Sequence, residues 1–449
     1  MQIKQWEDKN LSHFSYGILS DDKKVVLIDP SRNPQQYLDY AKDHDANIIG
    51  IIETHPHADF VSGHVEIHKK TGATIYTSSK VDATYVHEAF DEQKELQIGN
   101  IKLTALNTPG HSPDSICILL EHEGKQKAVF TGDTLFIGDC GRPDLRPGDG
   151  NAKEEAEKLA KQMYHSLREK LMVLDDETIV YPAHGAGTLC GKALSKANSS
   201  TIGEEKKTNW SLKEQTQDEF VQELLSDQPF VPLYFPFDVQ MNREGALHLN
   251  ESIDKIKTGK AANDNVVSML DKTFWFIDTR KEEDYKKGHL PHSINLMEEG
   301  KFETWLGSII NPDEQFYLVS KTEEQLKRML ERTAVIGYEG QVAEGFVFNG
   351  GTETQEIIDI KKFKEDSDSF TIVDVRNTSE VKEGKPFKNS ISIPLPELRK
   401  RINEIPTNKP IVVHCAAGYR SAAASSLIKS KVNEQALVYD LGDAIKEFL

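Results

Sequence analysis

The chain has 449 residues and a mass of 50.5 kDa, a length at which a single hydrophobic core gives way to several, so about three domains are expected. A hydrophobic fraction of 38% and a charged fraction of 28% are ordinary for folded proteins and exclude a disordered chain. Lys and Arg total 54 against 72 Asp and Glu, and the net charge of -18 disfavours nucleic acid and acidic membrane surfaces as partners.

No targeting or membrane segment is visible in the sequence. Residues 1–10 are polar and lack the apolar core of a secretory signal, and no run of about 18 apolar residues occurs. We therefore expect a cytoplasmic protein with no membrane partner. Cys117, Cys140, Cys190 and Cys415 are too scattered for a disulfide framework, so exposed cysteines are expected to act as thiols.

The first 235 residues read as a layered α/β domain, because short β-rich runs alternate with helical stretches. Strands are expected over 24–28, 47–52, 74–77, 101–106, 115–120, 128–131 and 178–181, and helices over 35–42 and 152–170. The pattern Ser211-Leu-Lys-Glu214 predicts a capping box in front of an amphipathic helix that includes Phe220 and Leu224. Three prolines within residues 228–236 disfavour regular structure there.

The rest of the chain repeats itself. Phe274-Trp-Phe-Ile-Asp-Thr-Arg280 resembles Phe370-Thr-Ile-Val-Asp-Val-Arg376, which begins 96 residues later. This self-similarity predicts two copies of one domain, over 240–350 and 355–449. The strand that ends at Ser320 in the first copy corresponds to the strand that ends at Cys415 in the second, so the first copy lacks the thiol.

Metal-binding side chains follow the predicted strands of the first domain. His55, His57 and Asp59 follow the strand at 47–52, and single residues follow three later strands: His111, Asp133 and His184. One such histidine alone is more often a hydrogen-bonded loop residue. The whole set, at strand ends where layered α/β folds build sites, indicates a metal centre.

These motifs resemble the metallo-β-lactamase superfamily: THxHxD (54–59), PGHSPDS (109–115), TGDTLF (131–136) and YPAHG (181–185). The resemblance implies an αββα sandwich over residues 1–235. Glyoxalase II-type members carry THxHxDH, whose last histidine helps to hold a second metal. Phe60 occupies that position here and cannot coordinate a metal, which argues against a two-metal hydrolytic centre.

The one-metal branch of the superfamily, the persulfide dioxygenases, is similar to this sequence at further points. The resemblance implies one Fe(II) per chain on His55, His111 and Asp133. Two imidazoles and a carboxylate leave positions for dioxygen and a substrate sulfur, the logic of non-haem iron oxygenases. His57, Asp59 and His184 would orient the ligands or shape the pocket, although the spacing alone also allows direct coordination.

Three further residues of the first domain have two interpretations each. Arg142 could hold the carboxylate of a thiol substrate or make a surface salt bridge, and Cys140 beside it could be a substrate contact or a packed small residue. Cys190 lies between glycines that could expose its sulfur as a second sulfur-handling thiol, or it could be buried and inert. The family's tyrosine after the His184 motif is missing here.

The C-terminal copy carries an apolar strand, a tight loop and the start of a helix in Ile411-Val-Val-His-Cys415-Ala-Ala-Gly418-Tyr-Arg420-Ser. Loop amides, the helix dipole and Arg420 would stabilise a thiolate or persulfide on Cys415, and Gly418 would let the loop close. The segment resembles the rhodanese loop CxxGxRS, whose spacing goes with sulfur transfer. The first copy resembles an inactive rhodanese-like domain.

The whole chain is similar to the fused persulfide dioxygenase–rhodanese family of bacterial sulfide detoxification. The resemblance implies oxidation of a low-molecular-weight thiol persulfide by dioxygen to sulfite, followed by sulfur transfer from Cys415 to sulfite to give thiosulfate. It also implies a homo-oligomer, a dimer or tetramer. Two alternatives stay open: a glyoxalase II-like thioester hydrolase fused to a rhodanese, and a non-catalytic sulfur sensor or carrier.

Overall fold

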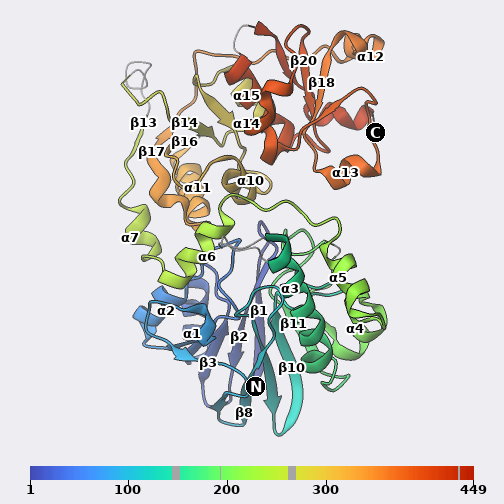
Figure 1. The fold of residues 1–449 in the computed structure, drawn as a ribbon. Helices are drawn as coiled ribbons and strands as arrows, with labels where there is room; N and C mark the ends of the chain where they lie inside the picture. Colours follow the sequence, from blue (N-terminus) through green and yellow to red (C-terminus); the bar gives the residue numbers. More distant parts are fainter. Residues whose placement is uncertain (144–151, 193, 261–268, 433–434, 449) are drawn as a thin grey trace. The chain divides into compact units, whose positions relative to one another are not determined.

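The computed structural model describes residues 1–143, 152–192, 194–260, 269–432 and 435–448 (Figure 1). Contacts divide the chain into two compact units. The first comprises residues 1–231 and 235–249, and the second comprises 232–234 and 250–449. The predicted boundary at residue 235 therefore falls at the start of a helix that belongs to the first unit.

Two six-stranded sheets form the centre of the first unit. The first sheet has the order β1 (Gln2–Asp8), β2 (His13–Leu19), β3 (Lys24–Ile28), β4 (Asn47–Ile52), β5 (Thr74–Thr77), β6 (Glu88–Ala89). The second has the order β12 (Ser200–Thr201), β11 (Ile179–Pro182), β10 (Lys125–Gly132), β9 (Ile116–His122), β8 (Ile101–Asn107), β7 (Glu95–Ile98). Strands β3 to β6 are parallel, whereas β7 to β10 form an antiparallel meander.

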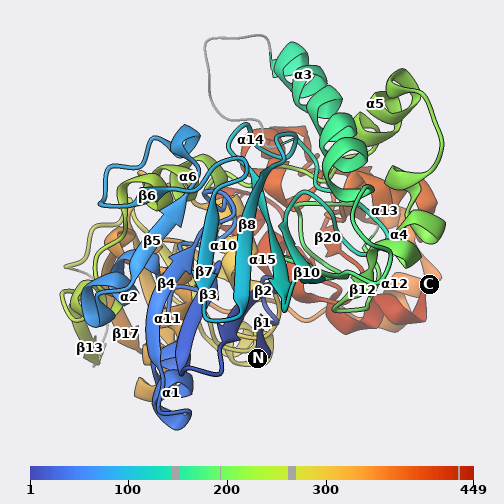
Figure 2. The same ribbon diagram turned by 90° about the horizontal axis from the view of Figure 1, so that it is seen from below.

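Helices cover the outer face of each sheet (Figure 2). The α-helices of the first unit are α1 (Gln35–Asp43), α2 (His64–Thr71), α3 (Ala152–His165), α4 (Ile202–Thr208), α5 (Gln217–Leu225) and α6 (Phe235–Glu244). The π-helix η2 (Ser166–Leu171) continues α3, and η1 (Ser79–Val81) and η3 (Trp210–Leu212) are short 3-10 turns. One apolar cluster fills the space between the sheets, a second packs α1 and α2 on the first sheet, and a third packs α3 to α5 on the second. This arrangement confirms the predicted αββα sandwich.

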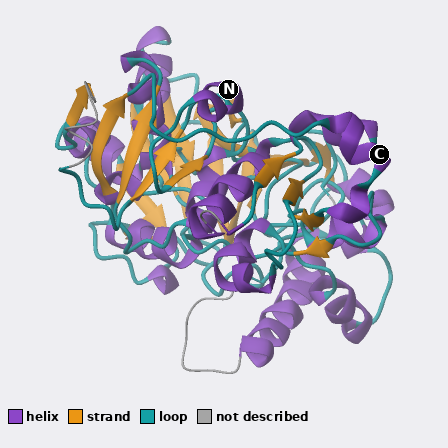
Figure 3. Ribbon diagram, turned by 90° about the horizontal axis from the view of Figure 1, so that it is seen from above, coloured by secondary structure: helices purple, strands orange, loops and turns teal. Residues whose placement is uncertain are grey.

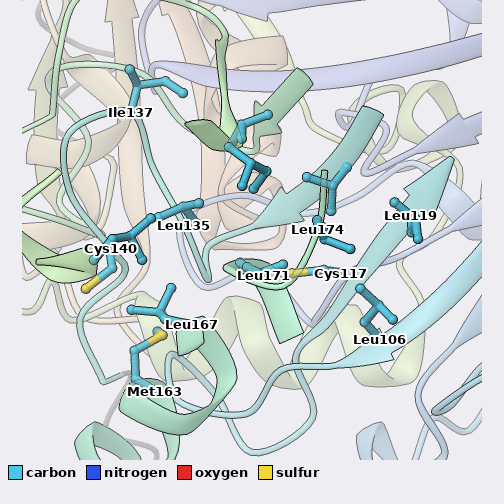
Figure 4. Close-up of a cluster of buried hydrophobic side chains, with 14 of the residues drawn as sticks. Leu106, Cys117, Leu119, Leu135, Ile137, Cys140, Met163, Leu167, Leu171 and Leu174 are labelled. Atoms are coloured by element: carbon cyan, nitrogen blue, oxygen red, sulfur yellow. The ribbon is translucent and has the colours of Figure 1, made fainter. Parts of the chain in front are cut away.

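The cluster under α3 contains two of the four cysteines. Cys117 on β9 is fully buried, and Cys140 is 1% exposed in the same cluster as Leu135, Met163 of α3 and the leucines of η2 (Figure 4). Burial raises the pKa of both thiols, to about 11 for Cys117 and well above the usual value for Cys140. Both side chains pack as small apolar groups here.

Two parallel sheets of the same order make up the second unit. The middle copy contains β13 (Thr258–Lys260), β17 (Val342–Val347), β16 (Phe316–Ser320), β14 (Trp275–Asp278) and β15 (Ser293–Asn295), in that order across the sheet. The C-terminal copy has the order β19 (Ile391–Ser392), β18 (Thr371–Asp374), β20 (Ile411–His414), β21 (Val438–Asp440). Without β13, the middle sheet reads β15-β14-β16-β17, which matches the C-terminal sheet strand for strand and confirms the repeat.

Helices flank both of these sheets, as the purple and orange ribbons of Figure 3 show. They are α7 (Leu249–Ile253), α9 (Glu282–Lys287), α10 (Phe302–Ile309) and α11 (Glu323–Val335), then α12 (Ile360–Glu365), α13 (Thr378–Glu383), α14 (Leu398–Arg401) and α15 (Tyr419–Val432). The 3-10 turns of this unit are η4 (Tyr338–Gln341), η5 (Ser367–Ser369), η6 (Leu395–Glu397), η7 (Ile402–Glu404) and η9 (Gly442–Glu447). No described helix is long and apolar enough to cross a bilayer.

One local prediction was wrong, and another was correct over only part of its range. The capping box before α5 is made by Thr216 and Glu219, not by residues 211–214, because Ser211 and Leu212 belong to the 3-10 turn η3 and Asn209 caps that turn. Residues 228–234 form no regular helix or strand, as the prolines predicted. Pro236, however, lies in the first turn of α6, where a missing N–H costs no hydrogen bond.

Gly110 offers a test of how tightly the second sheet packs on α3. Its φ is +153°, and a Cβ atom there would lie 2.5 Å from the Met163 Cα atom. We expect Gly110→Ala to lower the free energy of unfolding by about 3 kcal/mol or more, because backbone must move. Gly124→Ala is the control: its φ is also positive at +72°, but nothing lies within 4 Å of the added carbon, so about 1 kcal/mol is expected. Equal urea-unfolding midpoints for the two variants would contradict this packing.

Candidate functional sites

Three buried side chains of the first unit direct ligand atoms toward one point. The Nε2 atoms of His55 and His111 lie 3.8 and 3.6 Å from Oδ2 of Asp133. The three donor atoms lie within 4.8 Å of one another, and each residue is at most 2% exposed. His55 follows β4, His111 follows β8 and Asp133 follows β10, so strand ends from both sheets build this site.

The orientation of both imidazoles is fixed through their other nitrogen. His111 Nδ1 lies 2.6 Å from the Arg142 carbonyl oxygen, which can only accept, so Nδ1 carries the proton. His55 Nδ1 lies 3.0 Å from the Thr54 hydroxyl, whose own proton goes to Asp29 at 2.8 Å. Both Nε2 atoms therefore present lone pairs toward Asp133, the tautomer that a metal ligand requires.

Only one of the two Asp133 carboxylate oxygens accepts a hydrogen bond from a described residue. Its Oδ1 atom accepts a hydrogen bond from His184 Nδ1 at 2.7 Å, whereas its Oδ2 atom has no hydrogen-bond partner among the described residues. Burial alone would raise the pKa of Asp133, but the charge of His184 holds it well below its usual range. A buried anionic oxygen that faces two lone pairs is costly unless a cation lies between them, so the residues fit a metal ion.

His184 is held between two carboxylates. Its Nδ1 atom pairs with Asp133 and its Nε2 atom lies 2.8 Å from Asp59 Oδ2. Although burial lowers its pKa, Asp133 and Asp59 raise it well above the ordinary value. The imidazole thus fixes the metal-facing carboxylate with one nitrogen and Asp59 with the other.

The remaining predicted residues form two neighbouring groups. Asp59 and His184 lie with Cys190 in one group, and His57 lies with Asp29 and Glu53 in another. His57 Nε2 is 3.2 Å from Asp29 Oδ1.

Phe60 is 1% exposed and packs against two imidazoles. Its ring centroid lies 4.4 Å from that of His57 and 3.9 Å from that of His13. His13 could not be predicted from the sequence, because it lies on β2, far along the chain from every motif. The phenyl ring thus fills the space where glyoxalase II-type motifs carry a histidine.

Cys190 and Arg142 are both buried. Cys190 is 2% exposed, contrary to the exposure that its glycine neighbours suggested, because its carbonyl accepts from the Arg142 amide at 2.9 Å and its amide donates to Thr188 at 3.0 Å. Burial, together with Asp133 and Asp59, raises the pKa of this thiol well above its usual value. Arg142 is 4% exposed, and its guanidinium donates to the Pro229 carbonyl at 2.7 Å.

In the second unit, Cys415 lies at the end of β20 and begins the predicted loop. Its Sγ atom accepts a hydrogen bond from the Gly418 amide at 3.1 Å. Gly418 has a φ of +92°, and a Cβ atom there would lie 3.2 Å from the Gly442 carbonyl carbon. Helix α15 starts directly afterwards, so the loop amide and the positive end of the helix dipole both face the sulfur.

Arg420 is held by two neighbours that the sequence did not indicate. Glu380 accepts from both ends of its guanidinium at 2.5 and 2.7 Å, and the Trp305 ring of the middle copy lies 5.7 Å from its Cζ atom. Burial lowers the pKa of Arg420, but the bonds to Glu380 raise it above the ordinary value. The only sequence signal for Glu380 is its place in the capping box of α13.

The middle copy keeps the supporting pair and loses the thiol. Asp278 and Arg280 make the same bidentate pair as Asp374 and Arg376, with Nη2–Oδ2 distances of 2.6 and 2.7 Å. Ser320, at the position of Cys415, is fully buried with its hydroxyl 2.9 Å from that of Thr279. This copy therefore has a buried, hydrogen-bonded hydroxyl where the C-terminal copy has a thiol.

Family models match three segments of the chain. The metallo-beta-lactamase superfamily matches residues 10–184, and the rhodanese-like domain matches 262–354 and 357–447. A solved metallo-beta-lactamase from Staphylococcus aureus subsp. aureus COL is 31% identical, covers 77% of this chain and 98% of its own, and superposes with a TM-score of 0.68.

Two curated relatives match the first unit at similar identity. A probable hydroxyacylglutathione hydrolase of Schizosaccharomyces pombe is 35% identical over 38% of this chain, and the mitochondrial persulfide dioxygenase ETHE1 of Bos taurus is 27% identical over 36%. The chain spans 63% and 60% of these relatives' lengths. From the fold, the motif positions and these matches, the chain belongs to the metallo-beta-lactamase superfamily and carries two rhodanese-like domains in its second unit.

Proposed function

We propose that the first unit is an Fe(II)-dependent persulfide dioxygenase and that the C-terminal copy is the sulfurtransferase that uses its product, in sulfide detoxification. One observation carries this proposal: a single set of two imidazoles and one carboxylate, His55, His111 and Asp133, next to Phe60, which fills the neighbouring position with a group that cannot coordinate. Bound iron would supply the redox chemistry that activates dioxygen, which zinc cannot supply.

In the proposed reaction a thiol persulfide, dioxygen and water give the thiol, sulfite and two protons. The outer sulfur gains three oxygen atoms, two from dioxygen and one from water, and the sulfur–sulfur bond breaks. The chain's own residues hold the site for this step: Thr54 and the Arg142 carbonyl fix the imidazoles, and His184 fixes Asp133. His184 would also hold a proton between the Asp133 and Asp59 carboxylates.

In the second unit Cys415 would take the outer sulfur of a second thiol persulfide, which leaves as the thiol, and the resulting Cys415 persulfide would give that sulfur to sulfite. The bond between the two sulfurs breaks, a new bond forms to the sulfite sulfur, and thiosulfate leaves while Cys415 returns to the thiolate. The Gly418 amide and Arg420 stabilise the negative sulfur in both states. Joining the two activities in one chain raises the local concentration of sulfite at the transferase.

A metal-dependent thioester hydrolase of the hydroxyacylglutathione type is the second candidate. It is favoured by the relatives of that name and by the second group of donor atoms, from Asp59, His184 and Cys190. That group would have to replace the missing histidine with a thiol that must lose its proton to bind metal, and burial raises the pKa of Cys190. The persulfide dioxygenase proposal needs no such step.

Metal content and oxygen uptake distinguish a persulfide dioxygenase from a thioester hydrolase. We expect one iron per chain, oxygen uptake on a low-molecular-weight thiol persulfide, and loss of both uptake and iron in His111→Ala. His165→Ala is the control, because His165 is exposed on α3 and pairs only with Glu169 and Gln217 among the described residues. Two zinc ions per chain with thioester hydrolysis and no oxygen uptake would overturn the proposal.

Replacement of the Cys415 thiol separates the proposed activities of the two units. Cys415→Ser should leave oxygen uptake at the wild-type rate and reduce thiosulfate to background, because a serine hydroxyl cannot carry the sulfane sulfur. Ser320→Ala, at the corresponding position of the middle copy, should change neither product. If Cys415→Ser still made thiosulfate at the wild-type rate, the transferase thiol would have to lie elsewhere.

A further inference from the structure

The loop that carries His55 also contains His57, Asp59 and Phe60, and a side chain from far along the chain holds it. Asn242 on α6 donates from Nδ2 to the carbonyl oxygens of His57 and Phe60, both at 2.8 Å. Its Oδ1 atom accepts from the Ser62 amide, also at 2.8 Å. One amide group therefore makes hydrogen bonds to three main-chain groups within residues 57–62. We call the loop of residues 55–62 the metal loop.

These contacts are buried, so water cannot replace them. Asn242 is 2% exposed, and His57, Phe60 and Ser62 are each at most 2% exposed. An asparagine amide has two N–H donors and one carbonyl acceptor, and all three functions are used here. Removing the amide would leave two carbonyls and one N–H without partners in a dry interior, which forces the loop to rearrange.

Helix α6 is fastened to the first unit at its C-terminal end. Arg243 donates from Nε to the Val81 carbonyl at 2.7 Å, and its own carbonyl accepts from the Thr84 amide at 3.0 Å. Just after the helix, the Leu249 amide donates to the buried Glu66 carboxylate at 2.7 Å. Asn242 thus reaches the metal loop from a fixed element, although residues 232–234, which lead into α6, belong to the second unit.

We propose that Asn242 is a positioning residue of the metal centre, and that the helix after the superfamily segment 10–184 is therefore part of that centre. The loop is pinned at His57, Phe60 and Ser62, which sets the direction in which it leaves His55. The His57 ring also lies 4.2 Å from the His55 ring, so a shift at His57 moves the ligand imidazole. The proposal rests on the candidate metal centre and not on which reaction that centre performs.

The test compares metal binding in full-length variants. Wild type, Asn242→Ala, Asn242→Asp and the control Arg243→Ala are stripped of metal and titrated with Co²⁺ against a chromophoric chelator, and the visible absorption of the Co²⁺ forms is recorded. We expect both Asn242 variants to bind Co²⁺ about 10- to 100-fold more weakly, the range for residues that orient ligands, with an altered spectrum. Asn242→Asp has nearly the same volume, so it isolates the lost N–H donors.

Arg243→Ala removes an anchor of the same helix without touching the metal loop, so its affinity and spectrum should stay near wild type. Equal losses in Arg243→Ala and the Asn242 variants would show that general fastening of α6 matters and would overturn the proposal. Wild-type affinity and spectrum in Asn242→Asp would also overturn it, even if Asn242→Ala failed to fold. A wild-type protein that binds Co²⁺ but consumes no oxygen with iron would refute the dioxygenase and leave this comparison intact.

Discussion

The two carboxylate oxygens of Asp133 face different partners, and the rest of the site in the first unit depends on this difference. One oxygen is bound by His184, and the other is left facing two histidine lone pairs in a dry interior. Such an arrangement is stable only with positive charge at the centre, from a metal ion or from protonation of a histidine. The strand ends, the Thr54 and Arg142 contacts and the loop around Phe60 all serve to hold these atoms in place.

Local patterns in the sequence predicted most of this architecture. The strands at 24–28, 47–52 and 74–77 are found with the same bounds, because alternation and β-branched residues act over a few positions. The motif histidines and Asp133 could be predicted to converge because they follow strands. The contacts of Asn242, Glu380 and His13 could not, since each depends on a partner that is distant in the sequence or outside any motif.

The capping box shows a limit of a different kind. Residues 211–214 and 216–219 both fit the pattern of a hydroxyl side chain followed by a glutamate, and the amphipathic run after them suits either start. Only packing decides between them: Asn209 caps η3 and also donates to the carbonyls of Phe136 and Asp139. That buried network draws Ser211 into a turn and leaves the helix to begin after Thr216.

The middle copy carries Ser320 at the position of Cys415 and packs against the C-terminal copy. Within the second unit, the Tyr419 hydroxyl donates to the Met297 carbonyl at 2.9 Å, and the Ser426 hydroxyl accepts from the Asn295 amide at 2.9 Å. Both hydroxyls belong to α15, the helix that begins at the Cys415 loop. Arg399 also bridges to Glu314 through two bonds of 2.6 and 2.7 Å. A copy without a thiol thus still supports the helix on which the thiolate loop depends.

The contacts of Asn242 with the metal loop limit how such fused proteins can be rearranged during evolution. A gene fragment that encoded only the superfamily segment, 10–184, would lose α6 and with it the three contacts from Asn242. The segment that must be inherited as one piece is therefore longer than the segment that carries the motifs. It extends to the end of the first compact unit at residue 249. Recombination that exchanges the rhodanese-like copies would keep the metal loop intact only when its crossover falls after that helix.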